Sequence, residues 1–231
     1  MNADTRNQDP RPIRSFVIRA GRLTDSQRLA LRQHWDEYVF DYKSGVLDLD
    51  AVFPRPAPVN LEIGFGMGDS LLAMARENPA SNFLGIEVHK PGIGKLLNGL
   101  AREQIDNVRI LCRDAREVLQ NCIVPNSLAR VLLLFPDPWP KKKHHKRRLV
   151  QPDFVELVAS RLQPAGRFHL ATDWENYAEQ MLEVLEANSA LKNTQGPGRF
   201  WSNPDRPETK FERRGQRLGH EVRDLLYEKL G

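Results

Sequence analysis

A single aspartate, Asp137, lies between prolines at the end of an apolar run, in the segment LLLFPDPWPKKKHHKRR from Leu132 to Arg148. Eight consecutive lysine, arginine or histidine residues follow, at positions 141–148. Such a run is typical of a surface that binds a polyanion. A carboxylate beside it has a different task, because it stabilises positive charge. The segment therefore indicates a site where a cationic centre and a polyanion meet, the alternative being a solvated basic loop.

The distribution of charge supports this interpretation. The chain of 231 residues has a net charge of +4, yet residues 141–148 contain six Lys or Arg, and residues 1–22 contain five Arg against two Asp. The rest of the chain is therefore net acidic. Positive charge gathered in one loop and one terminal arm is expected where a polyanion docks at a defined place.

A second group of candidate residues surrounds the glycine loop LEIGFGMGDS. Gly64 and Gly66 permit a tight turn and a close backbone approach to a ligand. The dinucleotide-binding motif requires a glycine three residues after the second one, where this chain has Asp69. Glu62 adds a carboxylate just before the loop. We therefore expect a cationic or amine-bearing ligand rather than a pyrophosphate.

Two more carboxylates follow the next apolar runs. Glu87 ends NFLGIEV and could accept hydrogen bonds from both hydroxyls of a ribose. Asp114, in CRDAREVL, could accept one from the exocyclic amine of adenine. A ligand with a ribose, an amino-bearing base and a positive centre, but no phosphate, matches S-adenosylmethionine and not NAD. For each carboxylate taken singly, capping of a helix N-terminus is the alternative role.

The hydropathy pattern predicts the elements that position these residues. From Val59 onward, short apolar runs alternate with longer amphipathic segments, which predicts an α/β protein with a Rossmann-like, doubly wound, mostly parallel sheet. Ligands of such sheets bind at the carboxyl ends of the strands, where the candidate residues lie. The predicted strands are VNLEIG, NFLGIEV, VRILC, ARVLLLF and GRFHLA, and the predicted helices are DSLLAMAREN, GKLLNGLAREQ, AREVLQNC and PDFVELVASRL.

The two ends of the chain complete this outline. Residues 1–50 are expected to form a mobile basic arm and a helix that starts at a Thr24–Gln27 capping box and ends near Phe40. Its apolar face would consist of Leu29, Leu31, Trp35, Tyr38 and Val39. Residues 51–231 are expected to form one domain. We expect a further helix at about 174–187, a Gly/Pro/Asn-rich stretch up to Asp205, and a closing strand within RLGHEVRDLLYEKL.

Composition excludes several classes of protein. No apolar segment approaches the roughly 20 residues that span a bilayer, and the N-terminus lacks the apolar stretch of a secretory signal. Cys112 and Cys122 form no CxxC pair, and the six histidines show no metal-ligand spacing. We therefore expect a cytoplasmic protein without a membrane segment or a metal, and nothing in the sequence implies an obligate protein partner.

Four motifs together carry a family resemblance. E-x-G-x-G at 62–66, FPDPWPKKKHHKRR at 135–148, ATDW at 171–174 and RPETKFERRG at 206–215 closely resemble the bacterial tRNA (guanine-N7)-methyltransferase family, from about Asn60 to the C-terminus. The resemblance implies a class I methyltransferase fold, S-adenosylmethionine as cofactor and S-adenosylhomocysteine as its product. It further implies tRNA as the partner, with 7-methylguanine formed in the variable loop, at position 46 of the usual tRNA numbering.

The resemblance also assigns roles to residues. Asp137 would be the catalytic residue. The cofactor would be bound by Glu62, Gly64, Gly66, Glu87, Asp114 and Asp137. Substrate contacts would come from Lys141, Asp173, Thr209, Lys210, Phe211 and Glu212. The RNA-binding loop would consist of Lys142, Lys143, His144, His145, Lys146, Arg147 and Arg148.

The chemistry of guanine agrees with these roles. N7 has a lone pair and no proton to lose, so methyl transfer depends on positioning more than on a general base. Asp137 would stabilise the positive charge that develops on the base, while the basic run holds phosphates. Trp139 offers a flat face for a base, and Asp173 and Glu212 could accept from the N1 and N2 donors of guanine. Their alternative roles are a helix N-cap for Asp173 and an ion pair with a neighbouring arginine, 213 or 214, for Glu212.

Two other functions remain open at this point. An amino-directed nucleic-acid methyltransferase has an Asn/Asp-Pro-Pro-aromatic motif after its fourth strand, but PDPWP places Trp139 directly after a single proline. A non-catalytic RNA-binding module with the same fold predicts a degraded cofactor loop, whereas the glycines and carboxylates of that loop are all present.

Overall fold

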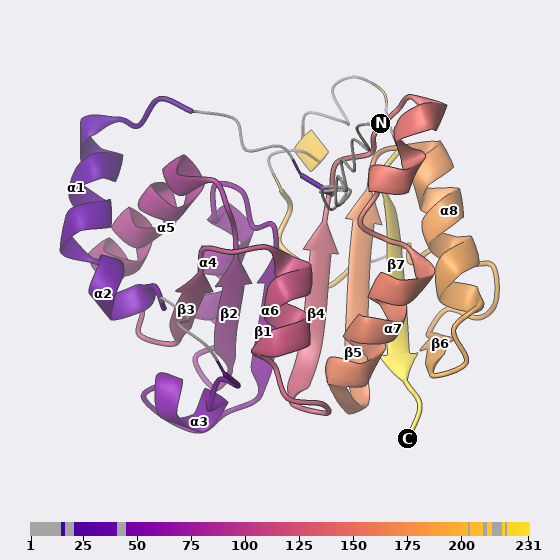
Figure 1. The fold of residues 1–231 in the computed structure, drawn as a ribbon, viewed down its shortest axis with the longest axis horizontal. Coiled ribbons are helices and arrows are strands. Elements are labelled where there is room, and N and C mark those ends of the chain that lie inside the picture. The colour runs from indigo at the N-terminus through magenta and orange to yellow at the C-terminus, as the bar shows by residue number, and fades with distance from the viewer. Residues whose placement is uncertain are drawn as a thin grey trace, which may run out of the picture.

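The computed structural model describes residues 15–16, 21–40, 45–202, 204–209, 212–213, 219 and 221–231. Its strands are β1 (Val59–Ile63), β2 (Asn82–Ile86), β3 (Val108–Leu111), β4 (Leu128–Leu134), β5 (Leu162–Thr172), β6 (Leu191–Asn193) and β7 (Arg223–Lys229). They form one sheet in the order β3-β2-β1-β4-β5-β7-β6 (Figure 1). β7 is antiparallel to both of its neighbours, and the four pairings from β3 to β5 are parallel. The predicted α/β, mostly parallel sheet is confirmed.

The helices that connect the strands also follow the prediction. They are α4 (Asp69–Glu77), α5 (Lys90–Glu103), α6 (Ala115–Asn121), α7 (Pro152–Arg161) and α8 (Glu175–Glu186). Three short elements were not predicted: α3 (Leu49–Val52), strand β6 and the 3₁₀-helix η1 (Lys142–Arg147). Each is seven residues or shorter, which is too little sequence for a hydrophobic period to stand out.

Two hydrophobic cores sandwich the sheet. Along β4, Val131 and Leu133 belong to one core and Leu132 and Leu134 to the other, because side chains alternate across a strand. Buried residues of α6, α7 and α8 complete the first core, and buried residues of α4 and α5 complete the second. Helices on both faces explain why the strands read as continuous apolar runs.

The N-terminal helix is shorter than predicted. The Thr24–Gln27 capping box is present, but the chain bends at His34 and divides into α1 (Asp25–Gln33) and α2 (Trp35–Tyr38). The bend brings Val39 into a parallel bridge with Ile110 at the edge of β3. Leu29 is 46% exposed, so its predicted place in the apolar face is wrong.

The N-terminal helices nevertheless pack against the rest of the chain. The buried Gln27 side chain donates a hydrogen bond to the carbonyl of Pro91 in α5, at 3.0 Å. Ala30 and Tyr38 are buried in the second core. The boundary predicted between residues 50 and 51 stays a prediction, and residues 1–14 of the expected arm lie outside the described part of the chain. Within the described part, no helix is both long and apolar enough to cross a membrane.

The first turn of α5 packs against the backbone of the glycine loop. A Cβ at Gly92 would overlap the carbonyl oxygen of Gly66, which is backbone and cannot rotate away. We expect Gly92→Ala to lower the free energy of unfolding by about 1–3 kcal/mol. Gly99→Ala is the control in the same helix, because its new methyl group meets only the flexible end of the Leu72 side chain. Its free energy of unfolding should fall less than that of Gly92→Ala. Urea unfolding of both variants measures the difference, and equal losses would contradict this packing argument.

Candidate active site

A cavity of about 440 Å³ opens at the carboxyl ends of β1, β2 and β4. Apolar residues form its floor, among them Ile63, Ile86 and Leu133, and its polar lining includes Glu87 and Asp137. The strands on either side of β1 continue to opposite edges of the sheet, so the loops after β1 and β4 diverge here. Ligands of doubly wound sheets bind at this switch point.

The glycine loop is held open by Glu87. Gly64, Gly66 and Gly68 all have positive φ, a conformation that glycine adopts without strain. One oxygen of the Glu87 carboxylate accepts from the backbone N–H of Gly66 at 2.8 Å, and the other accepts from the N–H groups of Val88 and His89. Glu87 therefore stabilises the loop and also faces the cavity, where its remaining lone pairs can accept from a ligand.

Glu62 is a buried carboxylate with one unused oxygen. Its Oε1 accepts from the Ser70 hydroxyl at 2.5 Å, whereas Oε2 is buried with no hydrogen-bond partner among the described residues. Burial raises the pKa of Glu62 to about 7, the Ser70 hydrogen bond opposes this, and the nearby charge of Glu87 adds to it. An unsatisfied acceptor of this kind beneath a ligand loop fits a ligand that brings a positive, hydrogen-bonding group.

Two other acidic residues have structural roles. Asp69 forms an ion pair with Lys95 at 2.5 Å, which offsets the charge that was expected to repel a pyrophosphate. Asp114 caps α6 and accepts from the backbone N–H groups of Arg116 and Glu117, so its alternative role as an N-cap is present. Its neighbours Arg113 and Ala115 line the cavity, which puts the Asp114 position at the cavity wall.

The PDPWP segment has an unusual backbone. Phe135 and Trp139 both have positive φ, at 53° and 45°, and Pro136, Asp137 and Pro138 lie between them. Such angles cost a non-glycine residue roughly 1–2 kcal/mol each, so the surrounding structure must hold them in place. The resulting turn leaves Asp137 exposed at the cavity. No described residue forms a hydrogen bond or ion pair with its carboxylate.

Trp139 is more enclosed than predicted. Its indole N–H donates to the carbonyl of Ser15 at 3.1 Å, the Arg147 guanidinium lies 4.0 Å from its ring centroid, and His144 meets its ring edge-on. One face expected to stack on a base is therefore already occupied by Arg147. Ser15 and Phe16, which also line the cavity, carried no signal in the sequence.

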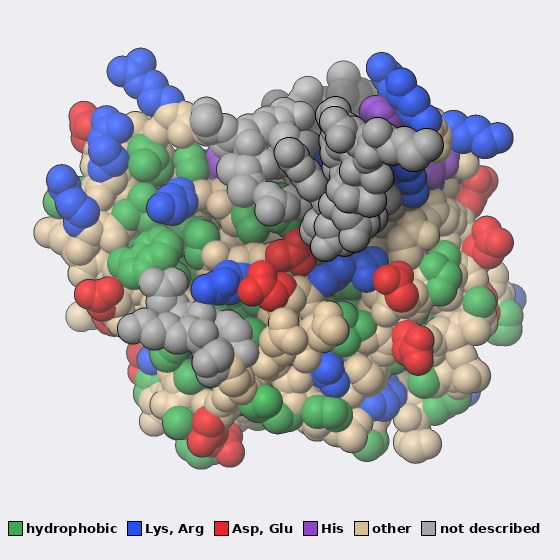
Figure 2. Space-filling model, in the orientation of Figure 1, with side chains coloured by type: hydrophobic (Ala, Val, Ile, Leu, Met, Phe, Trp, Pro, Cys, Tyr) green, Lys and Arg blue, Asp and Glu red, His purple; other side chains and the backbone are tan. Residues whose placement is uncertain are grey.

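The basic run forms η1 and the turn before it. Lysine, arginine and histidine side chains gather above α8 at the upper right of Figure 2. Lys141, Lys142, Lys143 and Lys146 are exposed there. Like charges therefore crowd one surface, which fits phosphate binding.

The burial of Arg148 contradicts its predicted place in the RNA-binding loop. Arg148 is only 2% exposed, and its guanidinium donates to the Pro138 carbonyl and to the side chains of Gln180 and Asn176, at 2.6–3.0 Å. A side chain used in this way cannot reach a phosphate. Arg148 instead closes the base of the loop, because its contact with Pro138 joins the two ends of the segment 138–148.

Among the described residues of the 205–213 segment, Arg206 contacts Asp224 on β7 and Phe135 at the cavity wall. The Glu212 side chain accepts from Arg206 at 2.5 Å and from the Thr209 backbone N–H at 3.2 Å. Its ion-pair partner is thus Arg206, while Arg213 pairs with Glu208. Arg206 is a residue whose importance the motif alone did not reveal. Lys210 and Phe211 lie outside the described residues.

The remaining candidates, Asp173 and Lys141, are not among the residues that line the cavity. Asp173 directly follows β5, and α8 begins after Trp174, so Asp173 is not the N-cap of that helix. Lys141 begins η1. Among the described residues, no three His, Cys, Asp or Glu side chains are grouped to hold a metal ion.

This fold is that of class I S-adenosylmethionine-dependent methyltransferases. The chain is similar in fold to the 16S rRNA methyltransferase KamB, with a TM-score of 0.55 over 93% of this chain and 99% of that one, at 16% identity. Residues 56–225 match the family model described as "Putative methyltransferase".

Sequence comparison defines the family further. The chain is 56% identical to the tRNA (guanine-N(7)-)-methyltransferase of Alcanivorax borkumensis, over 95% of this chain and 92% of that protein. It is also 56% identical to the enzyme of that name from Methylococcus capsulatus, over 99% and 97% of the two chains. The protein belongs to the tRNA (guanine-N7)-methyltransferase family.

The buried carboxyl of Glu62 makes stability depend on pH. Its pKa is about 7 in the folded protein, against 4.5 as the ordinary value. Between these values the folded state keeps a proton that the unfolded state has lost, so stability falls as pH rises. Relative to Glu62→Gln, the wild type without cofactor should lose about 2–3 kcal/mol between pH 5 and pH 8. Urea unfolding at the two pH values measures this.

The control for this comparison is Glu77→Gln, which changes an exposed glutamate at the end of α4. This variant should follow the wild type at both pH values. If Glu62→Gln also follows the wild type, the Glu62 carboxyl titrates normally and the argument from its burial is wrong.

Proposed function

We propose that this protein transfers the methyl group of S-adenosylmethionine to N7 of guanine 46 in the variable loop of tRNA, with S-adenosylhomocysteine as the second product. The observation that carries the proposal is the 56% identity to tRNA (guanine-N(7)-)-methyltransferases over nearly the whole chain. With tRNA as its substrate the enzyme acts in the cytoplasm. It uses neither a metal nor an obligate protein partner.

The cofactor would occupy the cavity at the carboxyl ends of β1, β2 and β4. Glu87 has lone pairs available for the ribose hydroxyls, and Gly64 and Gly66 leave room for the ligand against the backbone. The unused Oε2 of Glu62 supports an ammonium-bearing ligand, which would satisfy the buried acceptor and lower the cost of its charge. Asp114 would contribute from the wall beside adenine.

When bound, the cofactor supplies an electrophilic methyl group that the lone pair of guanine N7 displaces from sulfur. Asp137 is the proposed catalytic residue, because its carboxylate is exposed at the cavity and has no described partner to neutralise it. It would stabilise the positive charge that builds up on the imidazole ring of guanine. No proton leaves N7, so Asp137 acts through its charge rather than as a base.

The basic loop and the 205–213 segment would hold the tRNA. Lys142, Lys143 and Lys146 are exposed, and His144, His145 and Arg147 are half-buried, in the loop that follows Asp137 along the chain. We assign all six to phosphates. Lys141, Asp173, Thr209, Lys210, Phe211 and Glu212 would contact the nucleotide itself. Contacts to phosphate set the position of the RNA, and contacts to the base edge select guanine.

The decisive experiment maps the modified nucleotide. The protein is incubated with labelled S-adenosylmethionine and an unmodified tRNA transcript, which is then cleaved chemically at 7-methylguanine. We expect cleavage at the variable-loop guanine, and its loss when that guanine is replaced by adenine. Label without cleavage would instead indicate methylation of an exocyclic amine, and no label would contradict the proposal.

Removing the charge of Asp137 should slow the reaction without unfolding the protein. We expect Asp137→Asn to reduce kcat by about 10- to 100-fold, because an amide of the same shape stabilises developing positive charge poorly. Urea unfolding should match the wild type, since Asp137 is exposed. Asp50→Asn, in α3 at the opposite end of the sheet, is the control. Wild-type turnover in Asp137→Asn would exclude an electrostatic role for this carboxylate.

Neutralising the basic loop should weaken tRNA binding in a salt-dependent way. In a variant with Gln at positions 142, 143, 146 and 147, the slope of log affinity against log salt should become shallower by about 3. The control carries Gln at four basic positions elsewhere, namely the half-buried Arg55 and the exposed Arg76, Arg167 and Lys192. If both variants change the slope equally, general charge rather than the loop attracts the RNA.

A further inference from the structure

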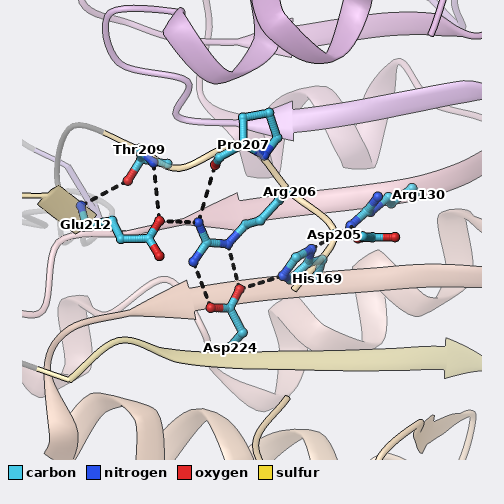
Figure 3. A network of polar contacts seen from close by, with 8 residues as sticks. All are labelled: Arg130, His169, Asp205, Arg206, Pro207, Thr209, Glu212 and Asp224. Carbon is cyan, nitrogen blue, oxygen red and sulfur yellow. Dashed lines mark hydrogen bonds and ion pairs between the residues drawn. The ribbon is translucent and has the colours of Figure 1, made fainter. Parts of the chain in front are cut away.

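A chain of buried charged groups connects the sheet to the 205–213 segment (Figure 3). Arg206 donates to both oxygens of Asp224 on β7, at 2.6 and 2.7 Å, and through its third nitrogen to Glu212. Asp224 also contacts the His169 ring on β5 at 2.7 Å, and Arg130 on β4 contacts the other ring nitrogen. The side chains of Arg206, Asp224 and His169 are at most 3% exposed.

Donors and acceptors match throughout this network of buried side chains. An arginine can only donate, so Arg130 makes Nδ1 of His169 an acceptor, and Nε2 then carries the proton that is donated to Asp224. Burial lowers the pKa of His169, in agreement with a neutral ring. Burial opposes the charge of Arg206, but the hydrogen bonds that it donates to Asp224 and Glu212 raise its pKa overall. Arg206 therefore stays charged between two carboxylates.

The carboxylate of Glu212 is engaged on one side only. Oε2 accepts from Arg206 and from the Thr209 N–H, and the Thr209 hydroxyl accepts from the Glu212 N–H in return. No described residue donates to Oε1. Two hydrogen bonds to its carboxylate and one from its backbone N–H therefore orient Glu212. Its side chain is 13% exposed, so it is still accessible. One free carboxylate oxygen at a defined place can accept from the N1 and N2 donors of guanine.

Arg206 also contacts the cofactor side of the site. Its guanidinium carbon lies 5.6 Å from the ring centroid of Phe135, the positive-φ residue that lines the cavity. Asp224 sits opposite Ala171 in the β5–β7 pairing, at the carboxyl end of β5. Arg206 is thus fixed by the sheet on one side, and it contacts both the cavity wall and Glu212 on the other.

We propose that Arg206 is a positioning residue for base recognition: anchored by Asp224, it holds the Glu212 carboxylate so that one oxygen is free to read the amino edge of guanine. This inference rests on the proposed reaction at guanine N7. Lysine cannot replace arginine here, because one ammonium group cannot bind Asp224 through two parallel hydrogen bonds and reach Glu212 as well.

The test compares guanine with inosine, which keeps N7 and N1–H but lacks the N2 amino group. Each enzyme is assayed on tRNA transcripts with guanine or inosine at the methylated position. We expect the wild type to prefer guanine by roughly 10-fold or more in kcat/KM. Arg206→Lys should lose most of this preference, with its affinity for S-adenosylmethionine, measured by calorimetry, unchanged. Arg167→Lys, which alters an exposed arginine paired with Glu228, should keep the preference.

The outcomes separate the inference from the reaction it rests on. If the wild type methylates neither transcript at N7, the proposed function fails. If Arg206→Lys slows both transcripts by the same factor, or if the wild type shows no preference, Arg206 does not position base recognition and the inference is overturned.

Should Arg206→Lys fail to fold, Glu212→Asp tests the same geometry, because it keeps the charge but withdraws the carboxylate by one methylene. It should also lose the preference, and an intact preference would overturn the inference.

Discussion

The pairing of β1 with β4 is the constraint on which the site depends. The chain builds β1, β2 and β3 outward in one direction and then returns to place β4 on the other side of β1. The loops that leave β1 and β4 therefore separate, and the cavity opens between them. The glycine loop and the PDPWP turn face each other across this opening only because the two strands are neighbours, although more than 60 residues separate Ile63 from Leu128 along the chain.

The buried charged groups Arg206, Arg148 and Glu62 have their hydrogen bonds satisfied to different degrees. Arg206 and Arg148 use all of their guanidinium nitrogens within the protein, so each orders a loop that has little secondary structure of its own. Glu62 in contrast keeps one buried oxygen without a partner. A fully satisfied buried group stabilises one conformation, whereas an unsatisfied one lowers stability until a ligand completes it. The satisfied arginines thus hold Glu212 and Pro138 in place, whereas the incomplete interaction, at Glu62, lies next to the glycine loop.

Hydropathy predicted the regular part of the fold. The five apolar runs from VNLEIG to GRFHLA are strands, and the four amphipathic segments between them are helices, because strands buried on both faces and helices buried on one leave strong periodic patterns. The hydropathy pattern predicted least where an element is short, or where a contact between residues distant in sequence sets the end of an element. The bend at His34 goes together with the bridge between Val39 and Ile110, a contact between residues distant in sequence that the helix pattern did not reveal.

The sequence by itself determined the α/β class, the order of the main elements, the glycine loop and the family to which its motifs point, since these depend on residue type and spacing along the chain. Only the tertiary structure decided how individual polar side chains are used. Arg148 is as basic as its neighbours but is buried against α8, and Arg206 pairs with Asp224 and Glu212 rather than with solvent. Burial and partner geometry are properties of residues distant in sequence, and they set whether a charge binds a ligand or holds the site together.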